Sequence, residues 1–270
     1  VFLRWAQYGA FLPLMENGGG GEHRPWMYDE QTTDIYRKFV TEHYRLIPYF
    51  MTTGMEAYES DGSVTVVRPV ARRDPETPDY RLPEPSTLSY LLGPDLIVHP
   101  VATQAASKDD LYRTGSEVRM TFPSEGALGE ESRWFSWFAP SDKSQAVSIP
   151  GGVEGGEVSL IRYVPLDSMA VYVRQNALIP LHASATDETV LFTWFNPIAD
   201  SEKSADVREP ASAGPGLVGT ISLSADGAMT GSISAHSSKA HGGFGWVVVG
   251  ITEPESVTFK VQFSTEETDN

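Results

Sequence analysis

The spacing of apolar residues changes its period after residue 62. Before that point, Ile35, Phe39 and Leu46 recur at close to 3.6 residues, which predicts an amphipathic helix over residues 35–58. Pro48 lies inside this stretch and is expected to kink the helix or to begin a new turn. From residue 63 onward, short runs rich in β-branched and aromatic residues alternate with Gly, Pro, Asp and Ser, a pattern typical of β-sandwiches.

The β-rich part divides into two groups of strands, separated by a polar stretch at residues 182–187. We therefore predict three parts, residues 1–62, 63–183 and 184–270. The charged, Ala/Pro/Gly-rich residues 201–216 are expected to form a surface loop. Residues 266–270 are expected to be a frayed tail. The expected strands are 63–69, 88–100, 117–123, 133–139, 146–150, 157–163, 170–180, 189–195, 216–223, 229–235, 245–251 and 256–263.

Near the N-terminus, an apolar and aromatic segment over residues 1–8 ends at Gly9. A second apolar run over residues 10–15 is short and contains Pro13, which favours a buried strand followed by a loop. Four consecutive glycines at 18–21 cannot hold a helix without a large entropic cost, so residues 16–26 are predicted to be a loop.

Composition narrows the possible functions. The net charge of −16 disfavours binding to nucleic acid or to an anionic membrane, because both carry the same sign of charge. The chain has no cysteine, which excludes disulfides, thiolate metal sites and a cysteine nucleophile, while leaving the compartment open. No apolar run reaches the roughly 20 residues of a transmembrane helix. We expect no cofactor, and the six histidines show no zinc-binding spacing and no serine-hydrolase elbow, so no metal is expected.

The glycine loop concentrates the candidate chemistry. Glu16, Asn17 and His23 supply polar groups, and Trp26 supplies an indole, on a predicted strand-to-helix loop. Such a set favours binding of a hydroxyl-rich ligand. The alternative is an ordinary surface loop whose polar groups cap its own backbone.

Two further features are expected to be structural. The run W-F-S-W-F at residues 134–138 could be a sugar-stacking platform, but the usual burial of aromatic residues favours coverage of both strand faces, by the sandwich core and by a neighbouring domain. His99 lies within an apolar strand, which favours a hydrogen-bonded core histidine.

Several motifs resemble one enzyme family. The segment R-W-A-Q-Y-G-A-F-L-P-L-M-E-N-G at residues 4–18 resembles the last barrel strand of glycoside hydrolase family 31, in which R-W-x-Q-x-G-A-F-x-P leads into a substrate loop. The resemblance covers about residues 1–183, and residues 184–270 fit the family's distal β-sandwich by position. The other matching motifs, in order, are R-P-W-M-Y-D, Y-R-L-I-P-Y-F, R-P-V, Y-L-L-G-P-D-L-I-V-H-P-V and P-L-D-S-M-A-V-Y-V-R-Q-N-A-L-I-P-L.

The resemblance implies a mixed fold: the last strand and helix of a (β/α)₈ barrel, followed by two all-β sandwich domains. The chain would begin in the helix before the last barrel strand. Residues 10–15 would be that strand and residues 35–58 the final helix. Residues 16–26 would then be a loop at the C-terminal end of a barrel strand, where such enzymes place their active sites.

The resemblance also implies that no catalytic residue lies in this chain. The family's two catalytic aspartates belong to earlier barrel strands, and Asp29 and Asp34 lie in the following helix region instead. The family often places a sugar-binding histidine in the loop, and counting back from Pro25 puts Asn17 at that position. His23 would supply the imidazole if the glycine loop folds back. The expected substrate-binding residues are Asn17, His23, Glu16 and Trp26.

The chain is thus expected to be the C-terminal part of a retaining α-glycosidase, α-glucosidase-like, acting on an α-linked saccharide. Its expected partner is the N-terminal fragment or chain of the same enzyme, separated by cleavage. Alternatives within the family are an α-xylosidase, a sulfoquinovosidase, a transglycosylase or a glucan lyase. A non-catalytic carbohydrate-binding β-sandwich protein is the alternative outside it, and exposure of the apolar residues near the N-terminus would count against that alternative.

Overall fold

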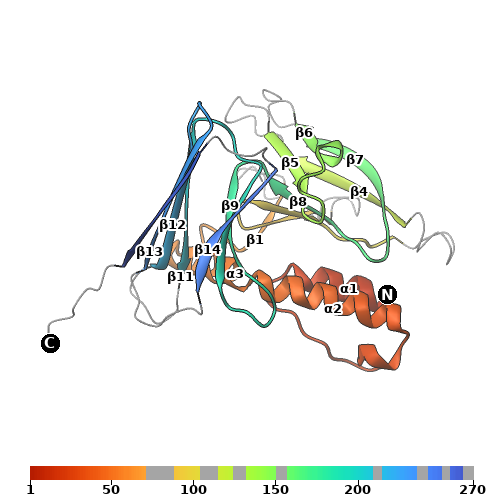
Figure 1. Cartoon of the computed structure of the whole chain (residues 1–270). Coiled ribbons are helices and arrows are strands. Elements are labelled where there is room, and N and C mark those ends of the chain that lie inside the picture. The colour runs from red at the N-terminus through yellow and green to blue at the C-terminus, as the bar shows by residue number, and fades with distance from the viewer. Residues whose placement is uncertain are drawn as a thin grey trace, which may run out of the picture. The chain divides into compact units, whose positions relative to one another are not determined.

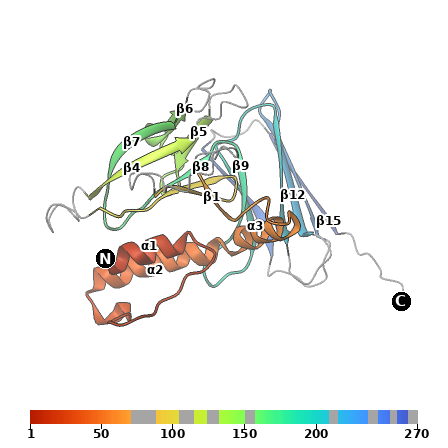
Figure 2. The ribbon, with the colours of Figure 1, turned by 180° about the vertical axis from the view of Figure 1, so that it is seen from behind.

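The computed structural model of the chain describes residues 1–70, 88–103, 115–123, 132–149, 157–208, 215–235, 243–250 and 256–263. These residues form two compact units, each assembled from segments distant in sequence (Figures 1 and 2). Unit 1 contains Val1–His43 and Val67–Arg174, and unit 2 contains Tyr44–Val66 and Gln175–Asn270. The division into residues 1–62, 63–183 and 184–270 stays a prediction about domains.

The described part of the chain begins with helices and continues with strands, as expected. The helices are α1 (Phe2–Ala10), α2 (Glu30–Arg45) and α3 (Ile47–Glu59), with short 3₁₀ turns at Pro25–Met27 and Lys143–Gln145. The strands of unit 1 are β1 (Val67–Pro69), β2 (Tyr90–Leu92), β3 (Leu96–His99), β4 (Ser116–Pro123), β5 (Ser132–Ser136), β6 (Val147–Ile149), β7 (Glu157–Val164) and β8 (Ala170–Arg174). Those of unit 2 are β9 (Ala177–His182), β10 (Val190–Phe195), β11 (Ser201–Arg208), β12 (Pro215–Leu223), β13 (Ala228–Ala235), β14 (Phe244–Val249) and β15 (Ser256–Phe263).

The long helical pattern is divided at Leu46, between α2 and α3. Pro48 lies in the first turn of α3, where its missing N–H would have had no helical partner. The expectation that Pro48 begins a new turn is therefore confirmed. Helix α2 starts earlier than the apolar pattern indicated, because the Asp29 carboxylate accepts the backbone N–H of Thr32 at 2.7 Å and caps the helix.

The expected strand over residues 10–15 is wrong for this chain. Helix α1 extends through Ala10, and a turn and irregular backbone follow it. A strand requires a neighbour whose N–H and C=O groups pair with its own. No strand among the described residues pairs with this segment, and Pro13 lacks one of the donors that pairing would use.

Two sheets pack face to face in unit 1. One has the strand order β1-β2-β3-β8-β5-β6, and the other consists of β4 and β7. Val118, Met120 and Phe122 alternate along β4 and point inward, where they meet Trp134 of β5 and Tyr172 of β8. This alternation produces the core of a β-sandwich, as the sequence pattern predicted.

The W-F-S-W-F run is buried, which confirms its structural interpretation. Trp134 is fully buried, and Phe135 and Trp137 are 4% and 6% exposed. The Trp137 indole N–H donates to Glu42 of α2 at 3.0 Å, and Phe138 packs against Phe39 with ring centroids 5.6 Å apart. The aromatic run therefore joins the helices of unit 1 to its sheets.

Unit 2 is a second sandwich. Its three-stranded sheet has the order β14-β10-β9, and its four-stranded sheet the order β11-β12-β13-β15. Phe192 and Trp194 of β10 are fully buried and share one core with Ile221 of β12 and Ile233 of β13. Helix α3 belongs to this unit, where its Thr52 hydroxyl donates to the Asp206 carbonyl at 2.8 Å.

Two sequence expectations for this region are corrected. Within residues 201–216, the predicted surface loop, strand β11 pairs with β12. It is polar because it is an edge strand, where charged side chains are common. The expected strand at 170–180 is divided into β8 and β9 by a turn at Asn176, whose φ is +65°. The predicted tail at 266–270 and the residues His236 and His241 lie outside the described residues.

Helix α1 is held against the rest of unit 1 by the partly buried guanidinium of Arg4. The Arg4 side chain donates to the carbonyls of Val164 at 2.8 Å, Pro165 at 3.1 Å and Ser168 at 2.9 Å. Burial lowers the Arg4 pKa to about 10, which leaves the group charged at neutral pH. One turn later, Gln7 donates to the carbonyl of Leu166. Helix α1 thereby binds four of the five backbone carbonyls from Val164 to Ser168.

Replacing Arg4 should destabilise the protein. Arg4→Met leaves three carbonyl oxygens without their charged donor, and the expected loss is about 2–4 kcal/mol of unfolding free energy. The matched control is Arg37→Met on α2, where the side chain is 68% exposed and the expected change is within about 0.5 kcal/mol. Denaturant unfolding of both variants tests this, and equal stabilities would contradict it.

Two glycines should respond to alanine in opposite directions. Gly54 lies inside α3 with nothing within 4 Å of an added Cβ, so Gly54→Ala should stabilise the protein by about 1 kcal/mol. A Cβ at Gly219 would lie 2.8 Å from the buried Phe192 ring, so Gly219→Ala should cost about 1–3 kcal/mol. Melting temperatures that move in the same direction for both variants would show that this packing is wrong.

Candidate functional site

The four predicted site residues lie in one connection of unit 1, between α1 and α2. This connection, residues 11–29, includes the four glycines and the 3₁₀ turn Pro25–Met27. Glu16 and Asn17 are exposed before the glycines, and His23 is partly buried after them. Trp26 is 67% exposed. The structure thus brings the predicted residues into one segment.

Hydrogen bonds close the glycine run into a small ring. The Asn17 amide Nδ2 donates to the carbonyl of His23 at 2.5 Å, joining the two ends of the run. The Asn17 side chain also hydrogen-bonds Tyr36 of α2, whose pKa is raised by burial and lowered by this bond, burial being the larger effect. Asn17 therefore has a structural task that its residue type alone did not reveal.

His23 lies beneath the glycine run. A Cβ at Gly19 would be 3.5 Å from the imidazole Nε2, and Gly19 has φ of +118°. That nitrogen is buried and has no hydrogen-bond partner in the described part of the chain. The glycine run thus covers the imidazole and does not present it to a ligand, and Gly19 permits the close approach because it has no side chain.

The C-terminal end of the loop is held by an ion pair between Arg24 and Glu22 and by contacts of the Tyr28 side chain. Arg24 binds the Glu22 carboxylate through Nε at 2.8 Å and Nη2 at 2.7 Å, and this contact lowers the Glu22 pKa to about 2. Both groups are exposed, so the pair orders the loop more than it stabilises the fold. The Tyr28 hydroxyl donates to the Glu22 carbonyl at 2.8 Å, and the Tyr28 ring stacks on Phe2 of α1 with centroids 5.2 Å apart.

Several large apolar side chains of α1 and of this loop are open to solvent. On α1, Trp5 is 66% exposed, although its ring contacts Tyr8 edge-on with centroids 5.9 Å apart. Leu14 is 74% exposed and Met27 56% exposed. Exposed large apolar residues that cluster along one stretch of chain mark a contact surface more often than residues scattered singly.

The two aspartates after the loop have structural contacts. Asp29 caps α2, which lowers its pKa. Asp34 pairs with Arg37 at 2.6 Å on the exposed face of the same helix. Neither belongs to a pair of carboxylates facing a common ligand position. Among the described residues, no group of three or more His, Asp or Glu is placed to hold a metal ion. None of the described helices is long and apolar enough to cross a membrane.

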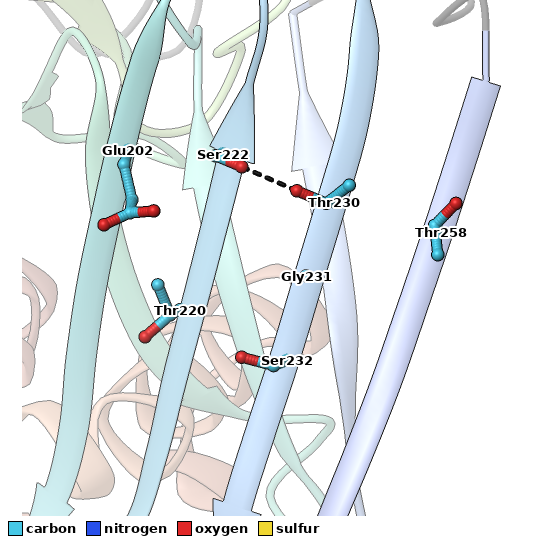
Figure 3. A pocket seen from close by; sticks show the side chains of 7 residues that line it. All are labelled: Glu202, Thr220, Ser222, Thr230, Gly231, Ser232 and Thr258. Atoms are coloured by element: carbon cyan, nitrogen blue, oxygen red, sulfur yellow. Dashed lines mark hydrogen bonds between the residues drawn. The ribbon is translucent and has the colours of Figure 1, made fainter.

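A concave surface lies in unit 2, on the outer face of the four-stranded sheet (Figure 3). Its volume is about 330 Å³. Cross-strand pairing aligns Glu202, Ser222, Thr230 and Thr258 in one row, and the hydroxyls of Ser222 and Thr230 are 2.7 Å apart. The surface was not predicted from the sequence. Its lining holds one carboxylate and no histidine, so it has no acid–base pair.

Comparisons with known proteins point to the same family as the sequence motifs. Residues 1–53 match the TIM-barrel domain of glycosyl hydrolases family 31. The chain is 29% identical over 195 residues to lysosomal α-glucosidase of Mus musculus, a match that covers 69% of this chain and 19% of that protein. It is 22% identical over 185 residues to an α-xylosidase of Saccharolobus solfataricus, covering 67% of this chain and 21% of that protein. The chain thus spans about a fifth of the length of these relatives.

The fold is also shared with solved structures. A family 31 dextranase from Flavobacterium johnsoniae superposes with a TM-score of 0.56 and 21% identity, covering 83% of this chain and 26% of that one. The resemblance to glycoside hydrolase family 31 is therefore confirmed, and the sandwich folds of the two units agree with it.

Proposed function

We propose that this chain is the C-terminal part of a retaining α-glycosidase of glycoside hydrolase family 31. In this proposal residues 1–53 belong to the (β/α)₈ barrel domain, whose strands lie in the rest of the enzyme. The two units supply the C-terminal β-sandwiches. The observation that carries the proposal is the match of residues 1–53 to the barrel family, which falls on the segment of unit 1 whose apolar residues are exposed.

The catalytic chemistry belongs to the remainder of the enzyme. One aspartate attacks the anomeric carbon and forms a glycosyl-enzyme, while a second carboxyl protonates the leaving oxygen and then activates water. The residues of this chain bind and orient the sugar. An α-glucoside or α-xyloside is the substrate class favoured by the names of the relatives. A lyase or transglycosylase would use the same loop.

Asn17 is the residue that we propose to contact the sugar, because its amide can donate and accept. Its Nδ2 also holds the glycine run closed. Glu16 and Trp26 extend outward beside it, and the indole offers a flat apolar face on which a pyranose can stack. His23 reaches a ligand only if the glycine run moves, because Gly19 lies over its Nε2.

The alternative of a free-standing carbohydrate-binding sandwich is weaker. Such a module has no use for an exposed Trp5 and Leu14, which are 66% and 74% exposed. Covering them against another part of the enzyme removes this apolar surface from water.

Trp5 tests the barrel proposal. In the complete protein, Trp5→Ser should lower the unfolding free energy by about 3 kcal/mol, because the indole would be packed against the rest of the barrel. Tyr58 on α3 is 80% exposed, and Tyr58→Ser serves as the matched control with an expected change within about 0.5 kcal/mol. If denaturant unfolding shows no effect of Trp5→Ser, Trp5 faces solvent and nothing covers this surface.

Asn17 tests the substrate-binding proposal. Losing a buried hydrogen bond to a sugar hydroxyl costs roughly 1–3 kcal/mol. Asn17→Ala in the complete enzyme should therefore lower kcat/KM on an aryl α-glucoside at least about tenfold. His23→Ala should have a smaller effect, because its Nε2 is covered.

The control for these kinetics is Asp34→Asn, an exposed position on α2 with no expected effect. Melting temperatures of all three variants separate binding from folding. Unchanged kcat/KM for Asn17→Ala would leave the loop with a purely structural role.

A further inference from the structure

One histidine is fully enclosed between the two sheets of unit 1. His99 is the last residue of β3 and is 1% exposed. Its ring centroid lies 4.9 Å from that of Phe122 on β4 and 5.9 Å from that of Tyr172 on β8. The ring therefore occupies the interior of the sandwich core, and His99 is not one of the site residues described above.

Only one of the two ring nitrogens has a polar partner. Nδ1 is 2.6 Å from the Ser89 hydroxyl, which can donate or accept. Nε2 is buried and has no hydrogen-bond partner in the described part of the chain. A neutral imidazole is tolerated here, since it carries no charge and needs only one strong partner. A protonated imidazole carries two N–H donors, and its Nε2–H would be charged and unpaired among aromatic rings.

Among the residues that the structure describes, none offers His99 a compensating negative charge. Strand β8 contributes the Tyr172 phenol, whose pKa is raised by burial. The charge that acts on this phenol is positive and belongs to the Arg162 guanidinium of β7. Strand β4 contributes Phe122, and its charged residues Glu117 and Arg119 are exposed. From β2, the Tyr90 hydroxyl donates to the Phe11 carbonyl.

We propose that His99 is an acid-sensitive latch of unit 1, whose protonation opens the packing of β3 against β4 and β8. The inference does not rest on the proposed enzymatic activity. It follows from a titratable ring whose enclosed site can hold only its uncharged form.

The direction of the pH effect follows from the burial. Burial lowers the pKa of His99 to about 3, whereas an unfolded histidine titrates near 6.5. The open state therefore binds the proton first, and stability that is present above about pH 6.5 is lost as the pH falls toward 3. From pH 7 to pH 5 the opening equilibrium should rise about 25-fold.

Other groups can be separated from His99 by the choice of pH. The carboxylates whose pKa values are lowered, such as those of Asp142 and Asp187, titrate below about pH 4 in both states. Between pH 7 and pH 5 histidines dominate. His43, also in unit 1, serves as the comparison histidine. It is partly buried, its ring contacts the Ala10 carbonyl at 3.2 Å, and burial also lowers its pKa.

Hydrogen exchange of the complete protein tests the latch. Exchange of the amides of β3 and β8, divided by the intrinsic rate at each pH, gives the opening equilibrium. We expect it to rise about 25-fold from pH 7 to pH 5 in the unaltered protein and less than about threefold in His99→Gln. His43→Gln should keep the rise in β3 and β8.

Three results of this experiment would contradict the proposal. A flat opening equilibrium in the unaltered protein does so without any variant. A rise that persists in His99→Gln, or one abolished by His43→Gln, assigns the acid sensitivity elsewhere. If His99→Gln does not fold, His99→Phe fills the aromatic site without a titratable group, and the same loss of pH dependence is required of it.

Discussion

The arrangement of unit 1 depends on the hydrogen bonds of the partly buried Arg4 guanidinium. A charge partly removed from water must be matched by hydrogen bonds, and the Val164 carbonyl at the end of β7 and two carbonyls of the following loop provide them. Gln7 binds a fourth carbonyl of the same loop. Helix α1 cannot rotate or slide without breaking all of these bonds together. The point at which the glycine loop leaves α1 is fixed for the same reason.

The remaining contacts of α1 and α2 extend this anchor. Phe11 packs edge-on against Trp137 and Phe138, with ring centroids 6.4 Å and 6.2 Å apart. Lys38 donates to the Asp167 carbonyl at 2.7 Å, so α2 binds the same loop as Arg4. The aromatic run following β5 is thus a packing surface for the two helices that flank the candidate site. A sugar platform was the less favoured interpretation of this run, and it stayed open because exposed and buried aromatic runs have the same composition.

Alternation along strands was the part of the fold that the sequence predicted well. Val118, Met120 and Phe122 are separated by polar residues, so their common inward face follows directly from a period of two. Strand β11 shows the limit of this reasoning. It has few apolar residues, and its pairing with β12 depends on backbone groups that every sequence possesses. The turn at Asn176 was missed because the apolar runs on either side of it read as one strand.

The site was predictable in its residues but not in its internal contacts. The positions of Asn17, His23 and Trp26 around the four glycines placed them in one predicted loop. The family motifs indicated the role that is proposed for this loop. That Asn17 bonds the carbonyl of His23, or that Gly19 covers the imidazole, depends on loop closure through torsion angles that no periodicity records. The apolar run at 10–15 was assigned to a strand because sequence alone does not show whether a pairing strand is present. Its residues suit a barrel interior, yet in this chain no described strand pairs with it.

These contacts define what the loop can contribute. Glu22 is engaged by Arg24, and Asn17 by the His23 carbonyl, so the loop is ordered before any ligand arrives. A preorganised loop binds with less entropic loss than a flexible one. It provides polar and aromatic groups for orientation, whereas its carboxylates are committed to ion pairs and helix caps or stand alone. The geometry therefore agrees with the proposal that this loop binds and orients a ligand, and in that proposal the acid–base pair lies elsewhere in the enzyme.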